Sequence, residues 1–217
     1  MRRPQWTPAG TEWADYYEQT NYSPQVAAAK QALVAGMIDE LQPSSVWDLG
    51  ANTGVMSRLA SARGIPTEAF DVDPAAVERN YRQGRDERDP HLLPLVMDLT
   101  NPSPALGWDE SERLSLAGRG PVDLVLALAL VHHLAIGNNV PLDRIARVCR
   151  RLGRHVVLEF VPKRDGQVQR LLASREDIFP DDTAEGLERA FGAEFELRRR
   201  VPIAGSERLL YLFTARG

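Results

Sequence analysis

The chain has 217 residues, 43% apolar and 26% charged, which is enough for one domain with a sizeable core. Its net charge of −4, from 26 basic and 30 acidic residues, argues against a nucleic-acid partner, which usually requires a basic surface. Without a run of about eighteen apolar residues or an apolar stretch in the opening MRRPQWTPAG, neither a membrane span nor a secretory leader is expected. The lone Cys149 cannot form an internal disulfide, which favours a cytoplasmic protein.

A helix is expected to follow an aromatic opening segment. Ser23 suits the N-cap position and Pro24 suits the first helical residue. Apolar residues then recur at helical spacing as far as Leu41, and Pro43 ends the pattern. The aromatic residues that precede this helix are Trp6, Trp13, Tyr16, Tyr17 and Tyr22.

Downstream, strand-like runs alternate with helical patterns, which indicates an α/β domain with a mainly parallel sheet. Pro94 lies inside the third run and cannot donate to a ladder, so that strand should lie at a sheet edge. The fourth run is apolar throughout, as at the centre of a parallel sheet. The five expected strands are SVWDL, TEAFDVD, HLLPLVMDL, PVDLVLALALV and RHVVLEFVP.

The last two strand-like runs, FELRRRVPI and ERLLYLFTA, are separated by AGS and predict a terminal antiparallel hairpin, which brings the total to seven strands. Helices are expected between the strands. Their predicted ranges are 53–63, 74 onward with Asp73 as N-cap, 141–152, 167–175 and 184–191.

The stretch VWDLGANTG, residues 46–54, joins the first strand to the helix expected from Thr53. Glycines let the backbone approach a ligand, and ligands of such sheets bind at the carboxyl ends of the strands. The first N–H groups of that helix would face an anion. Dinucleotide binding needs G-x-G-x-x-G, but Asn52 and Val55 replace two of its glycines, and Asp48 would repel a pyrophosphate.

Three carboxylates follow three successive strands. Asp48 suits an ammonium, Asp71 suits the two hydroxyls of a ribose, and Asp98 suits the exocyclic amine of an adenine. S-adenosyl-L-methionine offers these three groups in that order. Each acid taken alone also fits an ordinary turn, and Asp73 is expected to act only as a helix cap.

Four stretches in register resemble the class I S-adenosylmethionine-dependent methyltransferases: VWDLGANTG, AFDVDPAAV, LVMDL and VDLVLALALVHHL. The resemblance covers residues 23–161 and implies a three-layer Rossmann-like fold over a single domain, residues 1–217. EWADYYEQTNYS and EFVPKRDGQVQRLLASREDIFP also look like a bacterial subgroup of nodulation-associated, methyltransferase-like proteins.

The resemblance implies a cofactor site for S-adenosyl-L-methionine and an aromatic segment, residues 1–22, that covers it; simple packing of those aromatic residues is the alternative. Asn52 departs from the glycine of many family members, which a conformation suited to Asn would tolerate. The implied cofactor-binding residues are Asp48, Gly50, Asn52, Gly54, Asp71, Val72, Asp98, Leu99, Tyr16 and Tyr22.

Candidate catalytic residues lie at or after the next strands. His132 and His133 follow the fourth strand and can take a proton near neutral pH, with His133 better matched to the family position; packing or helix capping is the alternative. Glu159 lies in an apolar strand, so it should be either paired or at the site. Trp108, in the long connection 100–120, either walls the ligand site or lies on a surface loop.

These features favour methyl transfer to an oxygen or nitrogen of a small molecule, by a monomer or homodimer without a metal. The missing N-P-P-Y tetrad after the fourth strand and the negative net charge weigh against RNA. Three alternatives stay open: a non-enzymatic partner subunit with this fold, an RNA or protein methyltransferase, and a nucleotide-dependent oxidoreductase.

Overall fold

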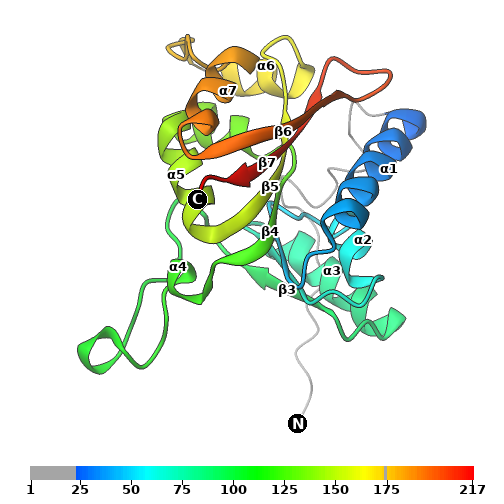
Figure 1. Cartoon of the computed structure of the whole chain (residues 1–217), viewed down its shortest axis with the longest axis vertical. Helices are drawn as coiled ribbons and strands as arrows, with labels where there is room; N and C mark the ends of the chain where they lie inside the picture. Colours follow the sequence, from blue (N-terminus) through cyan, green and yellow to red (C-terminus); the bar gives the residue numbers. More distant parts are fainter. Residues whose placement is uncertain (1–22, 174) are drawn as a thin grey trace.

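The computed structural model describes residues 23–173 and 175–217, so Tyr16, Tyr22 and the expected cover segment 1–22 lie outside the described residues. The described part contains one sheet (Figure 1). Its strands are β1 (Val46–Leu49), β2 (Thr67–Asp71), β3 (Leu92–Val96), β4 (Val122–Ala127), β5 (Gly153–Phe160), β6 (Phe195–Pro202) and β7 (Leu209–Ala215).

The strand order is β3-β2-β1-β4-β5-β7-β6. Strands β1 to β5 pair in parallel, whereas β7 runs antiparallel to both β5 and β6. The predicted seven-stranded sheet with a terminal hairpin is therefore confirmed. Strand β3, which contains Pro94, lies at one edge, and β4 lies in the interior between β1 and β5, as the sequence patterns predict.

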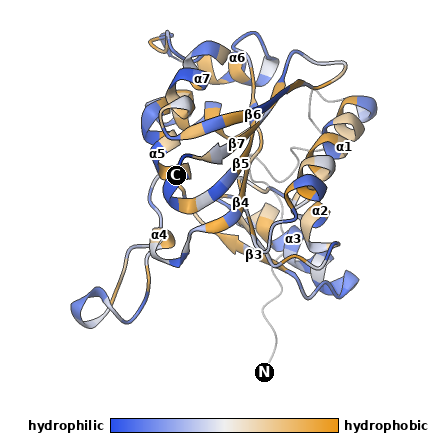
Figure 2. Cartoon of the chain, in the orientation of Figure 1, coloured by the Kyte–Doolittle hydropathy of each residue, from blue (hydrophilic) through white to orange (hydrophobic). Residues whose placement is uncertain are grey.

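Helices cover both faces of the sheet, which gives three layers. Helices α1 and α2 pack with β4 and β7 in one hydrophobic cluster, and α5 and α7 pack on the opposite face in another. Figure 2 shows the hydrophobic residues concentrated on the strands between these helices. The helices are α1 (Pro24–Leu41), α2 (Ser57–Ser61), α3 (Pro74–Glu87), α4 (Leu116–Arg119), α5 (Leu142–Leu152), α6 (Gly166–Leu172) and α7 (Ala184–Gly192), with a 3₁₀ turn η1 (Trp108–Glu110) and a π-helical turn η2 (His133–Gly137).

Two predicted caps begin the helices that flank the first strands. The Ser23 hydroxyl accepts a hydrogen bond from the Val26 amide at 3.3 Å, and Pro24 occupies the first turn of α1. The Asp73 carboxylate accepts from the Ala75 amide at 2.8 Å at the start of α3. Each side chain satisfies a backbone donor that has no partner inside its helix.

The helix expected over residues 53–63 is much shorter than predicted, because α2 covers only Ser57–Ser61. Asn52 and Gly54 have φ values of 51° and 78°, a left-handed conformation that a right-handed helix cannot include. Residues 50–56 instead form a series of turns, here called the glycine loop. The expected helix N-terminus at Thr53 is therefore wrong, and no anion site follows from it.

The long connection 100–120 is a surface excursion. Leu106 pairs with Arg113 across a small turn, and the segment projects away from the sheet (Figure 1). The Trp108 side chain at its tip is 84% exposed, so the interpretation of Trp108 as a pocket wall is wrong. None of the described helices combines the length and apolarity needed to cross a bilayer.

An aromatic cluster fastens α7 to the terminal hairpin. The Phe191 ring is fully buried and stacks on Phe195 and Phe213, with centroid distances of 5.9 and 5.2 Å. Tyr211 stacks on Phe213 at 5.5 Å. Such large buried rings dominate the free energy of core packing.

We expect Phe191→Ala to lower the free energy of unfolding by about 3–5 kcal/mol, because it removes a fully buried ring and leaves a cavity. Urea denaturation followed by circular dichroism measures the change. The matched control is Trp108→Ala, an aromatic deletion at an exposed position, which should change stability by less than about 0.5 kcal/mol. Equal effects of the two substitutions would contradict the described core.

Candidate functional site

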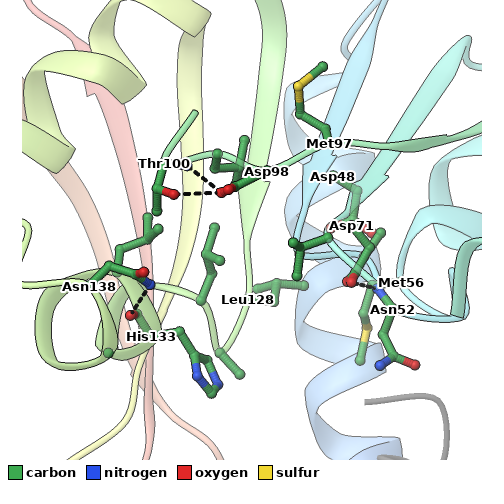
Figure 3. Close-up of a pocket in the computed structure, with 18 of the residues that line it drawn as sticks. Asp48, Asn52, Met56, Asp71, Met97, Asp98, Thr100, Leu128, His133 and Asn138 are labelled. Carbon is green, nitrogen blue, oxygen red and sulfur yellow. Dashed lines mark hydrogen bonds between the residues drawn. The ribbon is translucent and has the colours of Figure 1, made fainter. Parts of the chain in front are cut away.

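A cavity of about 390 Å³ opens at the carboxyl ends of β1, β2 and β4 and beside the residues that follow β3. Ligands of parallel α/β sheets bind at such ends. Figure 3 shows its lining side chains, with Leu128 between the Asp48–Asp71 side and the His133 side. The sequence-predicted residues that line it are Asp48, Gly50, Asn52, Asp71, Val72, Asp98, Leu99 and His133, whereas Gly54, His132 and Glu159 do not.

Asp48 lies near the end of β1 and is 1% exposed. Its Oδ2 accepts a hydrogen bond from the Ser57 hydroxyl at 2.6 Å. Burial raises the pKa of Asp48 to about 6, while the Ser57 bond and the charge of Lys30 oppose that rise. A buried carboxylate of this kind fits a cationic group, because a nearby positive charge favours its ionised form.

Asp71 joins the ends of β1 and β2. Its Oδ2 accepts from the Asn52 amide at 2.7 Å, and its Oδ1 accepts from the Asp73 amide at 2.9 Å. Burial raises the pKa of Asp71, and the backbone hydrogen bonds oppose the shift. Each carboxylate oxygen has capacity for a further hydrogen bond, so the group can accept from a ligand while it holds the loop.

Asn52 adopts the left-handed conformation, with φ of 51°. Its side-chain Oδ1 accepts from the Thr53 amide at 2.8 Å, a local bond that Asn makes readily in this conformation. The departure from glycine at this position is therefore tolerated for a backbone reason. The Asn52 side chain is buried and faces the cavity (Figure 3).

Asp98 follows β3 and is exposed on the cavity rim. Its Oδ1 accepts from the Thr100 hydroxyl at 2.7 Å and the Thr100 amide at 2.8 Å (Figure 3). These bonds hold the pKa of Asp98 below its usual range, so the group is ionised at neutral pH. Val72, which is 54% exposed, and Leu99 add apolar wall on the same side.

His133 opens the π-helical turn that follows β4, a type of turn often found at functional sites. Its carbonyl accepts from the Asn138 side-chain amide at 2.9 Å (Figure 3). Burial, and secondarily the charge of Arg208, lowers the pKa of His133 to about 4. The imidazole is therefore neutral at pH 7 and can accept a proton.

His132 lies behind His133 rather than in the cavity. It is 3% exposed, and its ring centroid lies 4.2 Å from that of His133. Burial lowers the pKa of His132 well below its usual range. Its geometry fits the packing alternative, so the structure separates two adjacent histidines that the sequence leaves nearly equivalent.

Glu159 is fully buried and does not line the cavity. Its Oε2 lies 2.6 Å from Lys30 Nζ, and its Oε1 lies 3.1 Å from Arg208 Nη1. Arg208 Nε also binds Asp165 at 2.8 Å. Glu159 is therefore paired with buried cations, as one of the two expectations had it. Its location away from the cavity does not support the expected catalytic role.

Lys30 and Ser57 are site residues that the sequence reasoning missed. Lys30 lines the cavity from α1 and lies on the buried stripe of that helix, with Val26 and Val34 one turn away on either side. A lysine on an apolar helical stripe signals a buried partner, and this signal was available in the sequence. Ser57 carries no comparable signal, because small polar residues are common at helix starts.

Side chains that could together hold a metal ion are absent from residues 23–173 and 175–217. The described cavity combines carboxylates on its β1–β3 side with a neutral imidazole and apolar side chains on its β4 side. Such a surface can bind a partly cationic polar ligand at one end and accept a proton at the other.

No model of a protein family matches the sequence. The nodulation protein NoeA of Rhizobium meliloti (strain 1021) is 37% identical over 202 residues, which are 93% of this chain. The chain spans 42% of the length of NoeA. The predicted likeness to nodulation-associated proteins is thus confirmed over nearly the whole chain.

Solved structures share the fold. The PH0226 protein from Pyrococcus horikoshii OT3 superposes with a TM-score of 0.63 at 13% identity, over 93% of this chain and 99% of that one. The magnesium protoporphyrin IX methyltransferase ChlM from Synechocystis PCC 6803, with bound SAH, gives 0.60 at 15% identity, over 94% and 93%. The bifunctional kinase-methyltransferase WbdD gives 0.58 at 18% identity, over 92% and 41%. Identities at this level establish the fold alone.

We expect Glu159→Gln to lower the free energy of unfolding by about 3–5 kcal/mol, because Lys30 and Arg208 would keep their buried charges without a carboxylate between them. The matched control is Glu196→Gln, which removes an exposed partner of Arg198 at 3.5 Å and should change stability by about 1 kcal/mol or less. Denaturant titration measures both. A Glu159→Gln protein that keeps its stability but loses activity would support a catalytic role for Glu159.

Proposed function

We propose that this chain, whose fold is that of the class I S-adenosylmethionine-dependent methyltransferases, binds S-adenosyl-L-methionine in the described cavity and transfers its methyl group to a small molecule. One observation carries the proposal. The cavity residues Asp98, Asp71 and Asp48 follow the strand order β3, β2, β1, and His133 comes next after β4. Adenine, ribose, methionine and acceptor would occupy the cavity in that order.

The residues fit the cofactor by their chemistry. Asp48 is a buried carboxylate whose pKa is raised by burial, and a ligand ammonium would favour its ionised form. Asp71 would accept charge-assisted hydrogen bonds from the ribose hydroxyls, and Asp98 would accept one from the adenine amine. Gly50, Asn52, Val72 and Leu99 complete the surface that would contact the cofactor.

The bound cofactor supplies a methyl group on a positively charged sulfur, which makes that carbon electrophilic. Because the thioether leaves as a neutral molecule, the chain does not need an acid to protonate it. The protein has three tasks: it aligns the acceptor with the methyl group, excludes water and, where the acceptor carries a proton, removes it. We assign that last task to His133, which is neutral at pH 7 and lines the cavity.

An oxygen or nitrogen of a small molecule is the acceptor that we propose. Leu134 and Leu171 line the cavity near His133, which gives the acceptor end an apolar wall. The net charge of −4 offers no general attraction for RNA. The structural relative ChlM is named for a small-molecule substrate, magnesium protoporphyrin IX.

A radiolabelled methyl-donor assay with an extract of the producing cell, separated into small-molecule, RNA and protein fractions, tests the proposal. We expect the label in the small-molecule fraction. Label in the RNA or protein fraction would contradict the acceptor class. Binding of S-adenosylhomocysteine without transfer to any fraction would instead support a non-enzymatic partner subunit.

We expect Asp71→Ala to weaken binding of S-adenosylhomocysteine more than tenfold, since a charged hydrogen-bond acceptor for the ribose contributes about 1.5–3 kcal/mol. Isothermal titration calorimetry measures the affinity. Asp73→Ala is the control, because Asp73 caps α3 and does not line the cavity. That variant should lose about 1 kcal/mol of stability and keep its affinity. Unchanged binding by Asp71→Ala would refute the ribose assignment.

We expect His133→Ala to lower turnover by about 10²–10⁴-fold for an acceptor that loses a proton, with cofactor affinity nearly unchanged. The neutral imidazole is the active form and its pKa is about 4. Activity should therefore fall as the pH drops through about 4 and should not change for this reason between pH 6 and 8. NMR titration of the His133 imidazole measures that pKa directly. Equal turnover by the variant would remove His133 from the chemistry.

A further inference from the structure

We propose that Arg58 and Asn80 form a clamp that holds the glycine loop in its binding shape and so sets cofactor affinity without touching the cofactor; this inference rests on the proposed function. Neither residue lines the cavity. Both lie behind the loop, on α2 and α3 respectively. They are positioning residues, and the loop is the element through which they act.

The Arg58 guanidinium connects the loop to two places on α3. Its Nη1 donates to the Thr53 carbonyl at 2.8 Å, and its Nη2 donates to the Asn80 carbonyl at 3.1 Å. Its Nε lies 3.1 Å from Glu87 Oε2 near the end of α3. The Arg58 side chain is 16% exposed, so its two bonds to backbone carbonyls are partly shielded from water, whereas Glu87 is 48% exposed. The planar guanidinium fixes all three directions at once.

The Asn80 side chain packs against the glycine loop at Gly54. Asn80 is 1% exposed, and Gly54 has a φ of 78°. A Cβ atom at Gly54 would lie 2.3 Å from Asn80 Oδ1 and 2.4 Å from Asn80 Nδ2. The amide therefore occupies the space beside the Gly54 Cα. This contact explains the need for glycine at a position that does not line the cavity.

The clamp and Asp71 contact the same short segment of the glycine loop. The Asp71 carboxylate accepts from the Asn52 amide at 2.7 Å, and Arg58 donates to the carbonyl of residue 53. The Asn80 side chain lies against Gly54. Residues 52–54 are thereby held at three successive positions. A loop ordered before binding spares the ligand the entropic cost of ordering it, which raises affinity.

A purely structural role would fasten α2 to α3 and affect only stability, so the test must separate affinity from stability. Arg58→Lys keeps the positive charge near Glu87, but one ammonium cannot reproduce the planar three-way contact. Arg63→Lys is the matched control. Arg63 binds both oxygens of Asp39, at 2.6 and 2.9 Å, and the Leu59 carbonyl, so it ties α2 to α1 without reaching the glycine loop.

We expect Arg58→Lys to raise the Kd for S-adenosylhomocysteine by roughly tenfold, by analogy with the residues that orient the ligands of metal sites, and Arg63→Lys to leave it within about twofold. Calorimetry measures the Kd, and thermal denaturation measures stability for both variants. An unchanged Kd for Arg58→Lys, with a Tm shift equal to that of Arg63→Lys, would overturn the proposal.

Amide hydrogen exchange in the ligand-free protein separates this proposal from the proposed function. We expect faster exchange over residues 50–55 in Arg58→Lys and not in Arg63→Lys. Unchanged exchange would refute the clamp even if the wild-type protein binds the cofactor. If the wild-type protein does not bind S-adenosylhomocysteine, the proposed function fails, and the role of the clamp in affinity fails with it.

A pair of substitutions tests the contact at Gly54. Gly54→Ala should abolish measurable binding, because the new methyl group meets the Asn80 side chain and the backbone is strained at this φ. Adding Asn80→Ala removes the obstructing amide and should restore part of the affinity. A double variant that binds no better than Gly54→Ala alone would show that Asn80 does not support the loop.

Discussion

The structure of the site depends on one buried carboxylate. Asp71 ends β2 and accepts hydrogen bonds from the backbone of two separate segments, the glycine loop through Asn52 and the start of α3 through Asp73. Without it, two backbone donors at the carboxyl edge of the sheet would lack partners at considerable cost in free energy. The same group faces the cavity, so the constraint that shapes the loop also presents an acceptor to a ligand.

A second set of charges lies beside the cavity. Glu159 on β5 pairs with Lys30 from α1 and with Arg208 beside β7, and Arg208 also binds Asp165 at the start of α6. Three stretches that are distant in sequence, at residues 30, 159–165 and 208, therefore meet at one buried cluster. Pairing makes the burial of these charges tolerable, and it ties α1 to β5 and to the residue before β7. Lys30 is the member of this cluster that also lines the cavity.

Much of the architecture was predictable from local patterns. Ser23 and Asp73 were identified as caps, Pro94 marked an edge strand, and the apolar run of β4 marked an interior strand. The site was predictable in outline too, since acids that end successive parallel strands must lie at one edge of the sheet. These inferences succeed because each depends on a few neighbouring residues and on one rule of backbone hydrogen bonding.

The sequence by itself determined the succession of strands along the chain, two of its helix caps and which acids lie at the strand ends, because propensity and periodicity are local properties. Only the tertiary structure decided that Asn52 and Gly54 are left-handed, that Glu159 is paired, and that His133 rather than His132 faces the cavity. Those outcomes depend on partners brought together by folding. Asp71, Asn80 and Lys30 each contact a residue far away in the sequence, and local patterns do not identify such partners.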